Sequence, residues 1–207
     1  MKGKFITLEG CEGVGKSRQI QLLEEYMINN GIKYFLTREP GGTAVSEQIR
    51  TIILDGNNKE MCDECEALLY AAARAQLIKQ TLLPRLNAGE LVFCDRYVDS
   101  SLAYQGKARN LGYNFIENIN SLAFKKCMPD LTLFLDLSPE KAFKRKGGVD
   151  KSDRVETSGL SFHNQVYAGY KEIAKKYPDR ITVIDASGTK EQTHAKIIAA
   201  LHDKGIL

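Results

Sequence analysis

The sequence predicts an α/β fold in which a five-stranded parallel sheet carries helices on both faces. Five short runs are rich in β-branched and aromatic residues, each is followed by a segment with helical spacing, and the runs are apolar on both faces. Such strands pair in parallel and need helices on each side. The expected strands are 5–8, 34–37, 91–94, 131–136 and 181–184. The expected helices are 16–30, 44–54, 62–87, 114–126, 139–146, 160–176 and 190–203.

A glycine-rich loop directly follows the first strand. Residues 10–17 read GCEGVGKS and fit the pattern G-x-x-x-x-G-K-[ST]. The backbone N–H groups of such a loop converge on a phosphate, the lysine adds a positive charge, and the serine hydroxyl can ligate Mg²⁺. We therefore predict a nucleoside triphosphate site. Its residues are Gly10, Cys11, Glu12, Gly13, Val14, Gly15, Lys16 and Ser17.

Length and charge restrict the function classes. A chain of 207 residues can bury one sizeable core, so we expect a single domain over residues 1–207. The net charge of +3 is too small to indicate binding to nucleic acid or membrane, and no apolar run suits a signal peptide or a membrane span. These features predict a soluble, cytoplasmic protein whose substrate is small and anionic.

Charged residues stand at the ends of the second and third strands. Asp95 ends the third strand, where a carboxylate in a phosphate-loop protein approaches Mg²⁺ directly or through water. A helix-capping aspartate is the alternative. Arg96 follows it and Arg38 comes just after the second strand, so both should face one sheet edge and hold an acceptor that is itself a phosphate. A surface arrangement of Arg38 with Glu39 is the alternative.

Four segments resemble the motifs of thymidylate kinases of the bacterial type. They are DRYVDSSLAYQG at 95–106, TREPGGT at 37–43, LYAAARAQ at 69–76 and PDLTLFLD at 129–136. The resemblance runs essentially from end to end, and it implies a phosphate-loop kinase fold. It also implies a dTMP kinase, a phosphotransferase that converts ATP and dTMP, with Mg²⁺, into ADP and dTDP in dTTP biosynthesis, usually as a homodimer.

The resemblance also assigns the dTMP-binding residues. Tyr70 would stack on thymine, and Arg74, one helical turn later, would donate a hydrogen bond to thymine O4. Ser101 would meet the base edge, and Gln105 would act through water. Tyr104 would crowd the 2′ position of the sugar and so select deoxyribose. Taken alone, Tyr70 and Tyr104 could be core aromatics, and Arg74 could lie on a solvated helix face.

Glu12 is an acid inside a loop that attracts anions, so we expect it to have a polar task. The acceptor phosphate has a second pKa of about 6 and is mostly ionised at neutral pH, so the transfer needs no general base. By the resemblance, Glu12 lies near the sugar 3′-hydroxyl and the acceptor-side arginines. We therefore count Glu12, Lys16, Arg38 and Arg96 as catalytic, with Glu12 orienting groups. A loop-rigidifying role is the alternative for Glu12.

Two positions depart from the family pattern. Arg18 stands where the family often has a second hydroxyl residue, so a contact with the ATP α-phosphate should differ. Val14 stands where some members carry an arginine, and members without it usually supply transition-state arginines from a lid. We expect this lid at about 144–156, but a glycine and a valine occupy the positions where those arginines would lie.

The remaining charges of the lid are candidates for the catalytic cation. Arg145 resembles the residue that stacks on adenine, and the loop at 185–189 resembles the adenine-side loop. This leaves Lys146, Lys151 and Arg154 for the γ-phosphate, with Arg154 taken as the catalytic one and a solvated loop charge as the alternative for each. Because residues 144–154 read KRKGGVDKSDR, we expect a mobile loop.

The nearest alternative function is a kinase for another nucleoside monophosphate. Tyr70, Arg74 and Tyr104 argue against it, because all three favour a deoxypyrimidine. A nucleotide-switched binding module would need a residue that positions water and an effector surface, and the sequence shows neither. Cys62 and Cys65 form a single C-x-x-C pair, which is weak evidence for zinc or redox chemistry. His163, His194 and His202 lack metal-ligand spacing, so we expect them to be structural or solvated.

Overall fold

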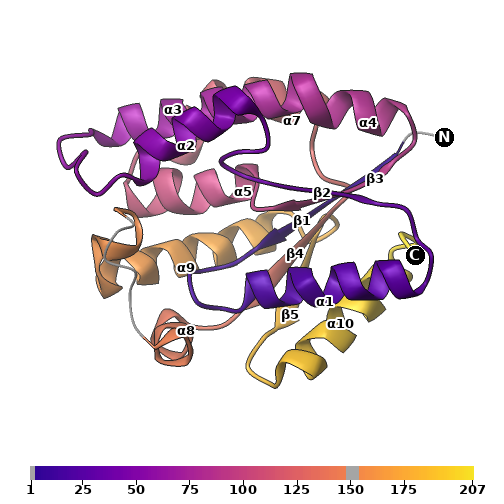
Figure 1. Cartoon of the computed structure of the whole chain (residues 1–207). Coiled ribbons are helices and arrows are strands. Elements are labelled where there is room, and N and C mark those ends of the chain that lie inside the picture. The colour runs from indigo at the N-terminus through magenta and orange to yellow at the C-terminus, as the bar shows by residue number, and fades with distance from the viewer. Residues whose placement is uncertain (1–2, 148–153) are drawn as a thin grey trace.

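The computed structural model, which describes residues 3–147 and 154–207, contains five strands in one parallel sheet (Figure 1). The strands are β1 Lys4–Glu9, β2 Phe35–Arg38, β3 Leu91–Asp95, β4 Leu131–Asp136 and β5 Ile181–Asp185. Their order across the sheet is β2-β3-β1-β4-β5, and all neighbours are parallel. Every predicted strand lies within one residue of its observed bounds. The predicted fold class is confirmed.

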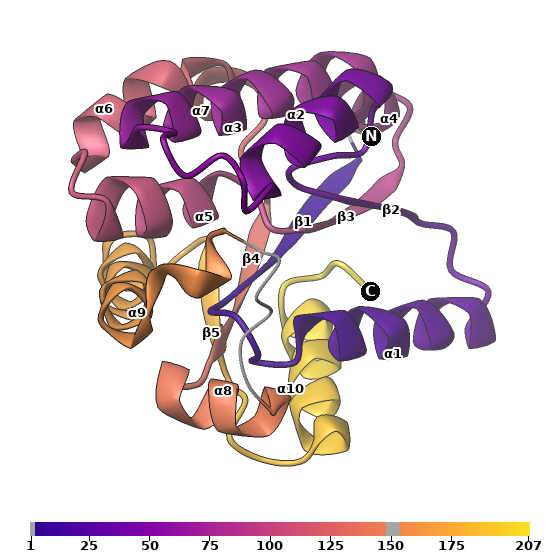
Figure 2. The same ribbon diagram turned by 60° about the vertical axis from the view of Figure 1, so that its left-hand side comes forward.

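Helices cover both faces of this sheet. They are α1 Lys16–Asn29, α2 Ala44–Leu54, α3 Asp63–Leu77, α4 Leu83–Asn87, α5 Val98–Ser101, α6 Tyr113–Ile119, α7 Ser121–Lys126, α8 Pro139–Lys146, α9 Leu160–Lys176 and α10 Lys190–Asp203. Helices α1 and α10 pack together on one face, whereas α3, α4 and α7 lie on the other (Figures 1 and 2). No helix in the described ranges has the length and apolar character needed to cross a membrane.

The helix predicted over 62–87 is interrupted. It begins as α3 at Asp63, widens into a π-helical segment at Ile78–Leu82 and continues as α4 from Leu83. Pro84, in the first turn of α4, has no N–H to donate to the preceding turn. A wider turn accommodates this missing hydrogen bond. The spacing of apolar residues in the sequence does not reveal such a turn.

The helix predicted over 114–126 is divided, and a further helix was missed. Asn120 ends α6 and precedes α7, and its side-chain amide donates to Ile116 O at 2.9 Å. Such local bonding competes with the continuous helix. The missed helix is α5, which passes into the π-helical segment Leu102–Ala108. The serines of α5 and Gly106 of the π-helical segment are weak helix formers, so propensity did not predict it.

The register of the sheet brings charged strand ends together. Leu8 of β1 pairs with Asp95 of β3, and Arg38 of β2 pairs with the same residue. Glu9, the last residue of β1, pairs with Phe134 of β4. Residues far apart in the sequence therefore meet at the carboxyl edge of the sheet, which is where parallel sheets bind ligands.

Candidate active site

A cavity of about 240 Å³ lies at this carboxyl edge. It joins the phosphate loop, the ends of β2 and β3, helix α3 and the α5 segment. The predicted site residues that line it are Glu12, Lys16, Ser17, Arg38, Tyr70, Arg74, Asp95, Arg96, Ser101, Tyr104 and Gln105. The structure thus brings the phosphate-binding and the base-binding residues of the prediction into one cavity.

Three glycines shape the phosphate loop. Gly10, Gly13 and Gly15 have φ angles of 149°, 76° and 99°, in the region that favours glycine. At Gly13 a Cβ atom would lie 2.7 Å from Ala142 O, so no side chain fits. Helix α1 begins at Lys16, directly after the loop. The unpaired N–H groups of its first turn therefore face the loop, as phosphate binding requires.

Three other predicted ATP residues have environments that limit their roles. Cys11 and Val14 are buried in the core, so only their backbone can face a nucleotide. Burial raises the pKa of Cys11 to about 12, and the thiol stays neutral. Arg18 lies on α1, where it donates to Gln21 Oε1 at 3.1 Å, and it is not part of the cavity lining. The structure gives no support to a side-chain contact between Arg18 and ATP.

Asp95 lines the cavity and carries an oxygen without a hydrogen-bond partner among the described residues. This oxygen, Oδ1, is buried, and Lys16 Nζ lies 4.0 Å from it. Ser17 lines the same cavity. A carboxylate oxygen and a hydroxyl are suitable ligands for Mg²⁺, which keeps several waters and binds substrate phosphates. No cluster of three or more His, Cys, Asp or Glu residues within 3–147 and 154–207 could hold a metal on its own.

Arg96 connects the acceptor side of the cavity to the phosphate loop. Its φ angle is 68°, which is uncommon for a residue with a side chain. Nη1 donates to Gly10 O at 2.9 Å, and Nη2 forms an ion pair with Glu12. The Tyr104 hydroxyl donates a hydrogen bond to Oε1 of the same carboxylate at 3.2 Å. Burial by itself would raise the pKa of Glu12, but Arg96 and then Lys16 outweigh it and lower the pKa to about 2. Glu12 is therefore a poor proton acceptor.

Two further arginines lie at the rim of the cavity. Arg38 donates from Nη2 to Glu47 Oε2 at 2.8 Å, and its side chain is half exposed. Arg50 of α2 donates to Pro40 O at 3.0 Å and also lines the cavity. No motif in the sequence marks Arg50, since a single arginine on an amphipathic helix is most often a surface charge.

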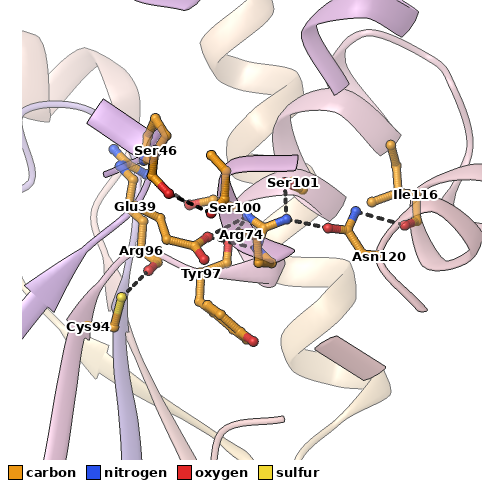
Figure 3. Close-up of polar contacts among 12 residues, drawn as sticks. Glu39, Ser46, Arg74, Cys94, Arg96, Tyr97, Ser100, Ser101, Ile116 and Asn120 are labelled. Atoms are coloured by element: carbon orange, nitrogen blue, oxygen red, sulfur yellow. Dashed lines mark hydrogen bonds and ion pairs between the residues drawn. The ribbon is translucent and has the colours of Figure 1, made fainter. Parts of the chain in front are cut away.

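Arg74 is buried, with only 2% of its side chain exposed. Its Nε and Nη2 atoms lie 2.7 and 2.6 Å from Glu39 Oε2. Nη1 donates to Ser101 Oγ at 3.0 Å and to Asn120 Oδ1 at 2.6 Å (Figure 3). Nη2 also donates to Tyr97 O at 3.2 Å. Four hydrogen bonds come from the guanidinium, and Nη2 also takes part in the ion pair with Glu39. A solvated helix face is thus excluded for Arg74. A hydrogen bond to thymine O4 would come from Nη1 or Nη2, both of which already lie near acceptors of the protein.

Glu39, the partner of Arg74, is itself incompletely satisfied. Its Oε1 is buried and has no hydrogen-bond partner in the part of the chain that the structure describes. Burial raises the pKa of Glu39 more than Arg74 lowers it, to about 7. The arrangement of Arg38 with Glu39 considered from the sequence is wrong, because Glu39 pairs with Arg74 and Arg38 with Glu47.

The remaining base-side residues are fixed by other parts of the chain. Gln105 donates from Nε2 to Glu66 Oε1 at 2.8 Å, which ties its carboxamide to α3, and the residue lines the cavity. Tyr104 is almost fully buried, and its ring makes an edge contact with Phe162. Tyr70 lines the cavity from α3, one turn before Arg74.

The lid residues have separate partners. Arg145 of α8 donates from Nη1 to Ala186 O at 3.0 Å and from Nη2 to Ser187 O at 3.4 Å, so it lies against the loop expected on the adenine side. Lys146 forms an ion pair with Glu156. Residues 148–153, which include Lys151 and much of the loop expected to be mobile, lie outside the described residues.

Lys146 lies closer to the phosphate loop than Arg154 does. A Cβ atom built on Gly13 would be 3.3 Å from Lys146 Cβ, and the charge of Lys146 contributes to the lowered pKa of Glu12 after Arg96, Lys16 and Tyr104. Neither Lys146 nor Arg154 lines the cavity, but Glu156, the ion-pair partner of Lys146, does.

Arg154 is held on the α2–α3 side of the molecule. It forms an ion pair with the buried carboxylate of Glu66 and donates from Nε to Ile53 O at 3.1 Å. Glu66 also accepts a hydrogen bond from Arg109 at 3.1 Å. The catalytic role predicted for Arg154 therefore has no support in this geometry, because its guanidinium is engaged away from the phosphate loop.

Comparison with known proteins identifies the family. The sequence profile of the family described as thymidylate kinase matches residues 8–197. The chain belongs to the thymidylate kinase family. Thymidylate kinases of Finegoldia magna and Geobacillus sp. strain WCH70 are each 45% identical to it, over 98% and 99% of this chain and 100% and 98% of their own lengths. That of Clostridium novyi is 46% identical over 90% of this chain and 92% of its own length.

The family assignment confirms the resemblance read from four motifs and confirms that the chain is a kinase. Several residues that support the cavity of this thymidylate kinase family member carry no motif of their own. They are Glu9, Arg50, Glu66 and Asn120. Glu9 could have been noticed because it ends an apolar strand, as Asp95 does, and Glu66 because it precedes Tyr70 by one helical turn.

The cysteine pair and the histidines have little connection with the site. Cys62 and Cys65 are exposed free thiols at the start of α3. His163 is buried, and its Nε2 lies 3.1 Å from Glu156 O. His202 contacts the C-terminal Leu207. These contacts suit the structural roles expected for the histidines.

Proposed function

We propose that this chain transfers the γ-phosphoryl group of ATP to dTMP, giving ADP and dTDP on the route to dTTP. The observation that carries the proposal is the single cavity, in which a phosphate loop at one end meets a buried base-binding end built from Tyr70, Arg74 and Gln105. The family of the chain and the names of its relatives agree with this activity.

The donor side is the phosphate loop. Its backbone N–H groups and Lys16 bind the phosphates of ATP, and Arg145 packs on the adenine side. Ser17 and Asp95 would hold Mg²⁺, directly or through water. When bound, the ion neutralises charge on the phosphate oxygens and fixes their geometry. The orphaned Oδ1 of Asp95 is the observation that supports this site.

The acceptor side is a set of arginines. Arg96, Arg38 and Arg50 hold the dTMP phosphate in line with ATP, so that an acceptor oxygen forms a bond to the γ-phosphorus as the bond to the β–γ bridging oxygen breaks. The acceptor is already an anion, so no proton has to be removed. Glu12 orients Arg96, a role that its lowered pKa and its ion pair support.

The base side recognises a pyrimidine deoxynucleotide. Tyr70 stacks on thymine, and Tyr104 closes the space beside the sugar 2′ position. Ser101 meets the base edge, and Gln105 acts through water. Arg74 donates to thymine O4 from the terminal nitrogens that lie near Ser101 and Tyr97.

The lid cation is assigned to Lys146. Arg154 is bound to Glu66, whereas Lys146 lies against the phosphate loop and is paired with Glu156, which lines the cavity. A lysine supplies a point charge that can stabilise the charge on the transferred group.

The chain is also proposed to be a single-domain homodimer. Helices α2 and α3 lie side by side on the outside of the molecule (Figures 1 and 2), and they expose Val45, Ile52 and Leu68, which are 48%, 47% and 51% exposed. Exposed apolar side chains gathered on adjacent helices are typical of an interface. In sedimentation experiments the chain should be a dimer and Leu68→Glu a monomer. A monomeric wild type would contradict this.

A cytoplasmic location is proposed as well. The five cysteines are free thiols, which suits a reducing compartment. Fractionation of cells that express the chain should recover it with the soluble cytoplasmic proteins, and recovery from another fraction would contradict the proposal.

The decisive experiment is a test of acceptors. The purified protein is incubated with Mg·ATP and dTMP, dUMP, dCMP, UMP or AMP, while diphosphate product and free phosphate are followed separately. We expect rapid dTDP formation with little free phosphate. Slow hydrolysis of ATP without transfer to any acceptor would refute the proposed function.

A further inference from the structure

Glu9 is a buried acid to which the proposed reaction gives no task. It is the last residue of β1, it has no exposed surface, and the phosphate loop begins directly after it. No lysine or arginine within 3–147 and 154–207 forms an ion pair with its carboxylate. An isolated buried carboxylate is costly unless hydrogen bonds satisfy it, so its presence here calls for a physical reason.

Four hydrogen bonds satisfy this carboxylate. Oε1 accepts from Tyr97 N at 2.7 Å and from Ser100 N at 3.3 Å. Oε2 accepts from Ser100 Oγ at 2.6 Å and from Tyr170 Oη at 2.8 Å. All four partners carry an N–H or O–H that can donate to the carboxylate oxygens. Three of the four donors belong to the segment that directly follows Arg96.

The first consequence concerns the backbone of Arg96. Its φ angle of 68° is unfavourable for a residue with a Cβ atom, and surrounding contacts must hold it. The N–H of the next residue, Tyr97, is bound by Glu9, and Arg96 N donates to Leu8 O at 3.0 Å. Residues of β1 thus hold the backbone on both sides of the Arg96 α-carbon.

The second consequence concerns the guanidinium of Arg96. Nη1 lies 3.3 Å from Ser100 Oγ and 3.2 Å from Tyr170 Oη. Both hydroxyls can give their protons to Glu9, and each then has a lone pair for Arg96. The ring of Tyr170 is stacked on Phe134 with centroids 5.1 Å apart, which fixes the position of its hydroxyl. Figure 3 shows Arg96, Tyr97 and Ser100 together at the ends of the strands.

We propose that Glu9 is a positioning residue of the acceptor site. Through the Tyr97 amide and the hydroxyls of Ser100 and Tyr170, it fixes both the backbone and the guanidinium of Arg96. Glu9 contacts no substrate itself. The inference rests on the proposed function, because it assigns Glu9 to the subsite in which Arg96 holds the acceptor phosphate.

The test is the isosteric substitution Glu9→Gln. It keeps the shape of the side chain, but its amide N–H groups would point at the hydroxyls of Ser100 and Tyr170, which donate to Glu9 in the wild type. We expect the KM for dTMP to rise about 10- to 100-fold, the scale of a hydrogen bond to a charged group. The KM for ATP should change less than about two-fold, because the phosphate loop is left intact. Glu25→Gln, at an exposed acid of α1, is the matched control and should behave as wild type.

A second substitution separates positioning from general stabilisation. Tyr170→Phe removes one hydroxyl between Glu9 and Arg96 and should also raise the KM for dTMP alone. If Glu9 acts through this hydroxyl, the KM for dTMP of the double variant, Glu9→Gln with Tyr170→Phe, should rise by less than the product of the two single increases. Multiplicative effects, or equal changes in the KM values for ATP and dTMP, would overturn the inference.

The outcomes also distinguish this inference from the proposed function. Should Glu9→Gln fail to fold, Tyr170→Phe decides, and an unchanged KM for dTMP in that variant overturns the inference. A wild type that binds dTMP in calorimetry but does not phosphorylate it refutes the function, while the loss of dTMP binding in the variants still supports the role of Glu9. A wild type that binds no dTMP refutes both.

Discussion

Lys146→Ala should slow phosphoryl transfer far more than Arg154→Ala. Two unit charges about 4 Å apart interact by ~4 kcal/mol at an effective dielectric constant of about 20. The Lys146 side chain is 36% exposed and is ion-paired with Glu156, so solvent and the carboxylate both weaken its effect. Taking roughly half of that energy, ~2 kcal/mol, predicts a loss of about 30-fold in kcat.

Arg154→Ala should instead weaken the fold. Arg154 is bound to Glu66, whose carboxylate is fully buried but retains Arg109 and Gln105 as partners. Loss of one of several partners of a buried charge costs on the order of 1–3 kcal/mol. We therefore expect a lower unfolding midpoint and a change of less than about three-fold in kcat, since the phosphate loop keeps its contacts.

The assay is ADP release at saturating ATP and dTMP, with thermal unfolding of each variant measured in parallel. Lys146→Arg should keep most of the activity, because it preserves the charge. Lys144→Ala, at an exposed lysine of the same helix, is the matched control. The reasoning is refuted if Arg154→Ala loses more than about ten-fold in kcat while Lys146→Ala is unchanged.

Three further predictions concern single residues of the cavity. Asp95→Asn should raise the Mg²⁺ concentration needed for half-maximal activity by about ten-fold or more, and an unchanged Mg²⁺ titration would exclude Asp95 from the metal site. Tyr70→Ala should raise the KM for dTMP about ten-fold, the energy of one stacked base, whereas Tyr70→Phe should not, and equal effects would argue against stacking. Glu39→Gln should flatten the pH dependence of stability. The pKa of Glu39 is raised from 4.5 to about 7, so its contribution is complete below pH 4.5 and is lost, by roughly 3 kcal/mol, as pH rises through 7. The free energy of unfolding of the wild type and of Glu39→Gln is measured in urea between pH 4.5 and 7.5. If it depends on pH in the same way in both proteins, Glu39 is not the cause.

The sequence predicted the sheet and most of the cavity lining for one physical reason. In a parallel sheet all strands end at the same edge, so residues that end apolar runs must meet there. Asp95 and Arg38 were placed correctly on this argument alone, and the register of β2 and β3 pairs them directly. Helix boundaries were less predictable, because Pro84 and Asn120 act through local hydrogen bonds rather than through the spacing of apolar residues.

The roles of Arg74 and Arg154 were not predictable from local patterns. Each depends on an acid distant in the sequence, Glu39 for Arg74 and Glu66 for Arg154. A motif identifies the type of residue and its place on an element, but not whether its hydrogen bonds are already used within the protein. That question is decided by tertiary packing, which brings together residues separated by 35 positions in one case and 88 in the other.

Two other acids, Glu12 and Glu156, explain why a site for two polyanions can fold without its substrates. Arg96 would repel Lys16 and the other cations of the cavity if no carboxylate lay nearby, and Glu12 supplies that compensation. Glu156 does the same for Lys146 in the lid.

The substrate phosphates must therefore compete with carboxylates for the basic groups, which lowers binding energy in the ground state. This cost has a use, because cations already held by fixed carboxylates need little reorganisation when charge shifts during transfer. Glu156→Gln should thus tighten the binding of ATP and yet lower kcat. Tighter binding with an unchanged kcat would show that Glu156 only balances charge.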